Sequence, residues 1–184
     1  MKERKETINL KTANLFSLAL FAATAVVFIV VYLLVWQPDK EAVKAAVSDP
    51  ALVSLPLIGA LLGGIVVHEL IHGVCWAMFA PSGFKSISFG VIWKMLTPYC
   101  HCNEPLKVKH YSIGALAPLV LLGIFPAIAG VAFHSYVALA YGVIFISAAA
   151  GDIMVAWRLR KEPAGNTVLD HPTEAGYIVY EEDK

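Results

Sequence analysis

Four long apolar stretches constrain the fold of this chain more than any other feature. Each has roughly the 20 apolar residues that a helix needs to cross a bilayer. A helix also satisfies the backbone hydrogen bonds of a spanning segment without outside partners. The sequence therefore predicts an all-α membrane protein. Its four transmembrane helices are expected at about residues 14–36, 51–80, 111–133 and 136–157.

The composition supports this class of protein. The chain is 58% hydrophobic and 15% charged, where soluble domains have about 45–50% and about 25%. Its formal net charge is zero, so it lacks the basic face that binds phosphates, and no nucleic-acid partner is expected. The three cysteines are an odd number without a framework of spacings, which argues against a disulfide-stapled fold.

Basic residues flank the apolar stretches unevenly. Four lie before the first stretch, four between the second and third, and four after the last, whereas only Lys40 and Lys44 follow the first. Cytoplasmic segments carry the excess of lysine and arginine. We therefore expect a multi-pass protein of the cell membrane, in contact with the lipid bilayer, with both termini and residues 81–110 in the cytoplasm. The first stretch is too long for a signal-peptide core and is expected to be a retained anchor.

Two segments outside these stretches have their own patterns. Residues 86–93 alternate weakly and are rich in β-branched and aromatic side chains, and residues 95–102 can return against them. This pattern predicts a short cytoplasmic-side hairpin or re-entrant loop between the second and third helices. Residues 161–184 are polar and contain two prolines and two glycines, so we expect a loosely ordered cytoplasmic tail after a single domain over residues 1–160.

Glu69 and Asp152 are the two acidic residues within the apolar stretches, and no lysine or arginine lies in the interior of any of them. A carboxylate at mid-bilayer costs at least about 2.5–3.5 kcal/mol, so such residues are functional candidates. Two carboxylates without a cationic side chain need another positive partner. A metal ion would serve.

His68 and His72 supply ligands for such an ion. At i and i+4 they project from one face of a helix, where both imidazoles can reach one Zn²⁺. Glu69 is offset from His68 by about 100° of helix rotation, so it can approach a water that the metal activates without binding the metal itself. The pattern predicts zinc as cofactor, His68 and His72 as metal ligands, and Glu69 as the catalytic general base.

Asp152 is the expected third ligand, because a catalytic zinc usually has three from the protein. At 1.5 Å per residue, Asp152 and the two histidines would all lie roughly 9–18 Å below the cytoplasmic boundary. Gly151 and the small residues at 147–150 would let the helices approach closely. Alternatively, Asp152 caps a helix, bonds to a neighbouring hydroxyl or tryptophan, or orients a histidine N–H, and the ligand-rich residues 99–104 supply the third ligand.

The other polar and aromatic side chains have simpler interpretations. Cys75 is expected to be a small buried residue, and His110, His134 and His171 to face solvent or the interface. Pro118 and Pro126 are candidates to kink the third helix. An interfacial aromatic belt is expected from Trp36, Trp76, Trp93, Trp157, Tyr111 and Tyr136.

The segment His68-Glu69-Leu70-Ile71-His72-Gly73, with Asp152 downstream, resembles the site-2 protease group of zinc intramembrane metalloproteases. Over about residues 50–160 the chain more closely resembles a bacterial family of membrane zincin peptidases. The further matching pieces are Cys-Asn-Glu-Pro-Leu at 102–106, Leu-Ala-Pro-Leu-Val at 116–120 and Gly-Asp-Ile at 151–153.

This resemblance implies zinc held by His68, His72 and Asp152, with Glu69 as general base, and cleavage of peptide bonds in or near the membrane. One departure concerns Asp152, which stands in Ala-Gly-Asp-Ile, whereas site-2 proteases often have Asn-Pro-Asp-Gly or Leu-Asp-Gly.

The leading hypothesis is an intramembrane zinc metalloprotease whose partners are membrane-embedded or membrane-adjacent protein substrates. The alternative is a non-catalytic zinc-binding membrane protein, such as a sensor or an inactive protease-like adaptor. A small transporter with a histidine and aspartate relay is a third hypothesis, against which stands the lack of an inverted repeat.

Overall fold

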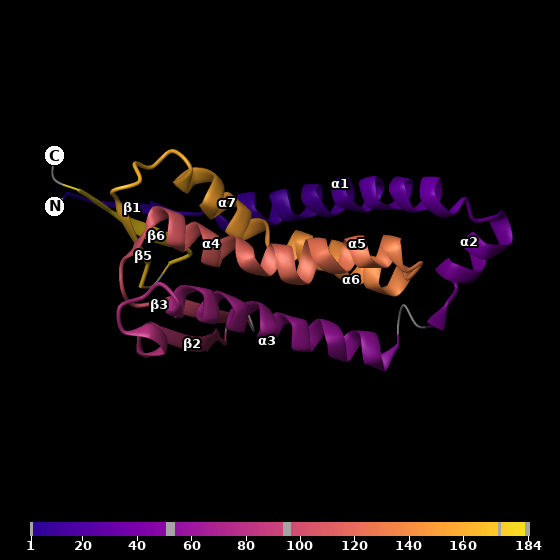
Figure 1. Cartoon of the computed structure of the whole chain (residues 1–184), viewed down its shortest axis with the longest axis horizontal. Coiled ribbons are helices and arrows are strands. Elements are labelled where there is room, and N and C mark those ends of the chain that lie inside the picture. Colours follow the sequence, from indigo (N-terminus) through magenta and orange to yellow (C-terminus); the bar gives the residue numbers. More distant parts are fainter. Residues whose placement is uncertain (1, 51–53, 94–96, 173, 183–184) are drawn as a thin grey trace.

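The computed structural model describes residues 2–50, 54–93, 97–172 and 174–182. Long helices lie side by side, and small β-sheets gather at one end, where both termini also lie (Figure 1). The helices are α1 (Leu10–Trp36), α2 (Lys40–Val47), α3 (Leu55–Ala77), the 3-10 turn η2 (Gly83–Ser86), α4 (Val108–Pro118), the π-helical η3 (Leu119–Ile124), α5 (Phe125–Ala132), α6 (Tyr136–Ala148) and α7 (Ala150–Leu159). The strands are β1 (Lys2–Thr7), β2 (Ile87–Ile92), β3 (Thr97–Cys102), β4 (Leu106–Lys107), β5 (Thr167–Asp170) and β6 (Gly176–Glu181).

Among the described residues, three helical segments are long and apolar enough to cross a membrane, namely Leu10–Trp36, Leu55–Ala77 and Val108–Ala132. A fourth exists if α6 and α7, which are bent by 49° where they meet, count as one broken span. Three to four candidate spans are thus present, as the apolar stretches predicted. The predicted start of the second span at residue 51 lies outside the described residues.

Local sequence signals explain where the helices begin. The side chains of Asn9, Asp39, Ser54 and Ser135 accept hydrogen bonds from backbone N–H groups in the first turns of α1, α2, α3 and α6. Such residues are favoured at helix starts because they satisfy N–H groups that have no partner inside the helix. The cap at Asn9 places the start of α1 at Leu10, earlier than the apolar pattern predicted.

The described residues are mostly helical, as predicted, but the fold is not all-α, because they also form two small sheets. The larger is antiparallel, with strand order β1-β6-β5-β4. Two of its strands, β5 and β6, lie in the segment 161–184 that was expected to be loosely ordered. Within that segment Val168, Tyr177 and Val179 are fully buried and pack against Leu106 and Leu159. The apolar residues of β5 and β6 are therefore buried although the average composition of the tail is polar.

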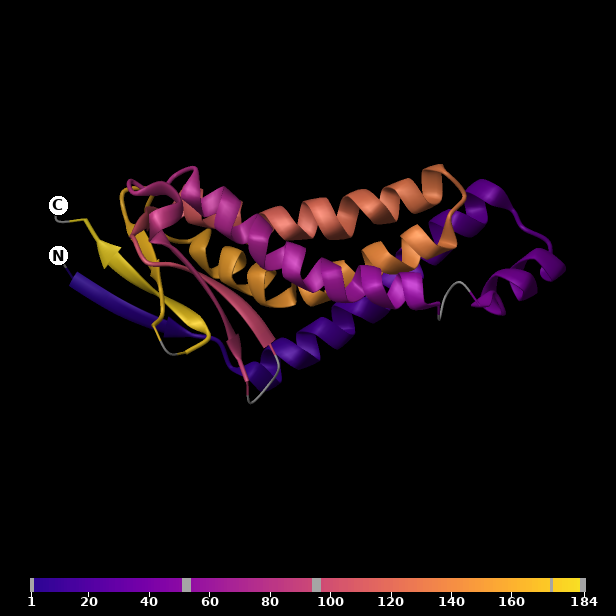
Figure 2. The ribbon, with the colours of Figure 1, turned by 90° about the horizontal axis from the view of Figure 1, so that it is seen from below.

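The smaller sheet pairs β2 with β3 in antiparallel fashion, with Phe89 opposite Cys100. Its strands follow the alternation seen in residues 86–102, although residues 94–96 lie outside the described part. The two strands run beside α3 (Figure 2). Gly73 allows this approach, because a Cβ there would lie 2.5 Å from the Phe89 ring.

Glycines bring α6 against the segment formed by η3 and α5. A Cβ at Gly142 would lie 2.3 Å from the backbone nitrogen of Ala127, and one at Gly130 would lie 2.4 Å from that of Leu139. Small residues at such crossings let backbones approach closely. Gly151 was expected to do the same beside Asp152, but nothing lies within 4 Å of a Cβ placed there.

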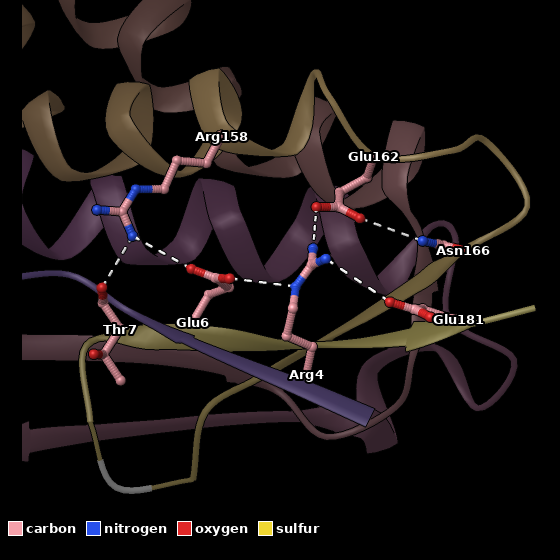
Figure 3. A network of polar contacts seen from close by, with 7 residues as sticks. All are labelled: Arg4, Glu6, Thr7, Arg158, Glu162, Asn166 and Glu181. Carbon is pink, nitrogen blue, oxygen red and sulfur yellow. Dashed lines mark hydrogen bonds and ion pairs between the residues drawn. The ribbon is translucent and has the colours of Figure 1, made fainter. Parts of the chain in front are cut away.

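A network of charged side chains joins the end of α7 to the N-terminal strand (Figure 3). The Arg158 guanidinium donates to the Thr7 carbonyl at 3.0 Å and lies 3.8 Å from the Glu6 carboxylate. Arg4 in β1 pairs with Glu6 at 3.3 Å and also with Glu162. These contacts join the end of α7 and the residue Glu162 after it to β1, and each exposed pair contributes only about 0–1 kcal/mol.

Candidate metal centre

One face of α3 carries the histidines. Gly64, His68, His72 and Trp76 follow one another at intervals of four residues, so they form one stripe along the helix. His68, His72 and Trp76 are buried, at 9%, 4% and 4% relative exposure. The Trp76 indole lies against Gly114 of α4, where a Cβ would be 2.2 Å from it. The stripe is therefore the face by which α3 packs against the rest of the bundle.

Asp152 reaches the histidines from the other side. The bend between α6 and α7 places it in the first turn of α7, where the helix dipole favours a carboxylate. One carboxylate oxygen lies 3.2 Å from His68 Nε2, and the other lies 3.4 Å from His72 Nε2. The three side chains thus meet, as the sequence predicted they can.

The donor set fits a zinc ion. His68 Nε2 and His72 Nε2 lie 3.2 Å apart, which matches the edge of about 3.3 Å in a tetrahedron with bonds of about 2.0–2.1 Å. Each nitrogen also lies within 3.4 Å of an Asp152 carboxylate oxygen. Two imidazoles and a carboxylate are ligands that zinc favours. Among the described residues, this is the one group of three or more such side chains close enough to hold a metal.

The His72 ring is oriented for metal binding. Its Nδ1 lies 2.9 Å from the Gly114 carbonyl oxygen. A carbonyl can only accept, so Nδ1 carries the proton and donates, and Nε2 keeps its lone pair directed at His68 and Asp152. Metal-binding histidines commonly have this kind of partner, which fixes both the tautomer and the ring.

Glu69 lies beside this group without joining it. Its side chain is partly buried, and it accepts a hydrogen bond from the backbone N–H of Cys100 in β3. The three-member metal group does not include it. Its carboxylate is therefore held next to the ligands by a strand of the small sheet, which suits a proton-transferring group.

The segment 99–104, the alternative source of a third ligand, takes other partners. The Cys102 thiol donates to the Glu104 carbonyl at 3.3 Å, and the Glu104 carboxylate accepts from Ser82. Burial raises the pKa of the Cys100 and Cys102 thiols, which disfavours the thiolates that bind metals. Among the described residues, no member of this segment belongs to the metal group.

Trp76 and Tyr111 were expected in an interfacial belt, and this prediction is wrong. Both are 4% exposed. The Trp76 indole stacks on the His72 ring with centroids 5.0 Å apart and on the Tyr111 ring at 5.1 Å. The position of Trp76, one helical turn after His72, was a signal that could have revealed this role.

The predicted exposure of the other histidines is confirmed for one and wrong for another. His134 is exposed and stacks on Trp36, as an interfacial position predicts, and His110 stacks on Phe79. His171 is 8% exposed and its Nδ1 accepts from the Glu174 N–H, so its expected exposure is wrong. Cys75 is partly buried.

Gly114→Ala is expected to disturb the centre without touching a ligand. The new methyl group would overlap the buried Trp76 ring, and overpacking of this kind costs about 1–3 kcal/mol. We expect a lower thermal midpoint in detergent and weaker zinc binding, because the Gly114 carbonyl would move away from His72. Gly151→Ala is the control, since it adds the same methyl group into open space beside Asp152. Equal behaviour of the two variants would contradict the prediction.

Comparison with known proteins agrees with this geometry. The model of the family described as Putative zincin peptidase matches residues 61–167, a segment that contains His68, His72 and Asp152. Neither curated proteins nor solved structures produce a match. The matched segment covers more than half of the chain, and the chain therefore belongs to the Putative zincin peptidase family.

Proposed function

We propose that this protein is an intramembrane zinc metalloprotease that cleaves membrane-embedded or membrane-adjacent protein substrates. The observation that carries the proposal is the meeting of His68, His72 and Asp152 at zinc-ligand spacing, with Glu69 alongside, in a member of a zincin family. The likeness to site-2 proteases, which the sequence motif predicts, is part of this proposal.

Each side chain has a defined task in the proposed reaction. A zinc ion held by His68, His72 and Asp152 would supply Lewis-acid chemistry for peptide hydrolysis. Glu69 takes a proton from the attacking water and later passes it to the leaving amine. The N–H of Cys100 holds the Glu69 carboxylate, and the Gly114 carbonyl keeps the His72 proton on Nδ1.

We further propose that both termini face the cytoplasm and that the site lies in the cytoplasmic half of the membrane. The support is the charge bias, since twelve basic residues lie on the proposed cytoplasmic side and two on the other. Substrates would then be cut near the cytoplasmic surface.

Metal removal tests the function directly. We expect the purified protein in detergent to contain one equivalent of zinc and to hydrolyse fluorescently labelled β-casein. Dialysis against 1,10-phenanthroline should remove both the zinc and the activity, and zinc should restore both. Tightly bound zinc with no hydrolysis of casein or of a peptide library would support the non-catalytic alternative instead.

A further inference from the structure

Asp170, at the end of β5, joins three elements around the metal centre. Its Oδ2 accepts from the backbone N–H of Cys102 at 2.7 Å, and its Oδ1 accepts from the Tyr111 hydroxyl. These donors belong to β3 and α4. Burial raises the pKa of Asp170, and the two hydrogen bonds act against that rise. Asp170 lies three residues beyond the segment that matches the family.

The strand β3 connects Asp170 to Glu69. Alternate residues of a strand direct their N–H groups to the same edge, and on this edge of β3 those residues are Pro98, Cys100 and Cys102. Pro98 has no N–H. The N–H of Cys100 donates to Glu69, and that of Cys102 donates to Asp170. Two carboxylates from distant parts of the chain therefore hold adjacent donors on one strand edge.

Asp170 also anchors the rings behind His72. The Tyr111 ring, whose hydroxyl bonds to Asp170, stacks on Trp76, and Trp76 stacks on His72. The Trp76 indole N–H donates to the Tyr111 backbone carbonyl at 3.0 Å. A shift of the Tyr111 side chain would therefore also move Trp76, which stacks on the metal-binding His72.

We propose that Asp170 is a positioning residue of the peptidase site, which holds β3 so that the Cys100 N–H stays on Glu69 and holds Tyr111 behind Trp76 and His72. This inference rests on the proposed function. Asp170 is not a member of the group of three metal-binding side chains. It acts through Cys102 and Tyr111, so β5 helps to set the geometry of the site.

Two substitutions at Asp170 separate positioning from packing. Asp170→Leu keeps a similar volume and removes the acceptor, whereas Asp170→Asn keeps an acceptor for the Cys102 N–H. Tyr111→Phe removes one of the two hydrogen bonds and keeps the ring stack. The matched control is Asp49→Leu, because Asp49 accepts from the Tyr136 hydroxyl and follows α2, at the end of the molecule opposite the sheet (Figure 1).

Three measurements are made on the purified full chain: zinc content, amide hydrogen exchange of residues 97–104, and kcat and KM on labelled casein per bound zinc. In Asp170→Leu we expect one equivalent of zinc, exchange at 97–104 at least tenfold faster, and kcat reduced by about 10–100-fold with little change in KM. The Asp170→Asn protein should recover most of the wild-type kcat. The kcat of the Tyr111→Phe protein should lie between those of Asp170→Leu and the wild type, and Asp49→Leu should match the wild type.

A purely structural role would lower the folded fraction but leave kcat per bound zinc unchanged, and that result would overturn the proposal. So would unchanged exchange at 97–104 in Asp170→Leu, or an Asp170→Asn protein as impaired as Asp170→Leu. If the wild type cleaves nothing, the proposed function fails separately, and the exchange data still decide whether Asp170 holds β3.

Discussion

Glu69→Gln protein is expected to keep one equivalent of zinc and to lose peptide hydrolysis. Glutamine has nearly the same shape and can still accept the hydrogen bond from the Cys100 N–H, and Glu69 is not a member of the metal group. It cannot take a proton from water, and general acid–base catalysis contributes about 10²–10⁴-fold. We expect kcat to fall by that factor, measured on labelled casein with zinc quantified by mass spectrometry.

Glu104→Gln is the matched control for this experiment. It makes the same change of acid to amide at a carboxylate that accepts from Ser82 and lies outside the metal group. Its activity should equal that of the wild type. If the Glu69→Gln protein retained its proteolysis, Glu69 would not be the general base.

Replacing Asp152 with alanine is expected to weaken zinc binding by about 100-fold or more. Structural zinc binds with about 10–16 kcal/mol shared among four ligands, so each ligand contributes about 2.5–4 kcal/mol, and about 1.4 kcal/mol corresponds to tenfold. His68→Ala and His72→Ala should have losses of the same size. Competition with a chromophoric chelator at fixed pH measures each affinity.

The size of the loss decides the role of Asp152. If Asp152 only orients one of the histidines, its removal should weaken zinc binding by about 10–100-fold. In that case the effect of Asp152→Ala should differ between the His68→Ala and His72→Ala proteins. His171→Ala is the control, because His171 is a buried histidine outside the metal group. Wild-type affinity in the Asp152→Ala protein would remove Asp152 from the ligand set.

Several features were predictable because they depend on residues close together in the chain. The candidate spans follow from runs of apolar residues, and the caps at Asn9 and Ser54 are local hydrogen bonds. His68 and His72 share a helix face at any packing, because their spacing of four residues matches the helical turn. The rise per residue also predicted that Asp152 can reach both histidines, and the three side chains do meet.

Other features depended on contacts between distant segments. The strand β1 is a run of charged and polar residues without alternation, so its sequence does not predict a strand or a pairing partner. It pairs with β6, from the other end of the chain, and the buried residues of that partner pack into the core. The 49° bend that directs Asp152 at the histidines likewise has no proline to mark it.

The sequence by itself determined the apolar spans, the shared face of His68 and His72, and the class of chemistry that these residues permit. Only the tertiary structure decided that Trp76 backs His72, that Cys100 holds Glu69, and that Asp170 reaches the site from the C-terminal sheet. The physical reason is that periodicity and depth are encoded along one helix, whereas the hydrogen bonds that orient a catalytic group join segments whose meeting depends on the packing of the whole chain.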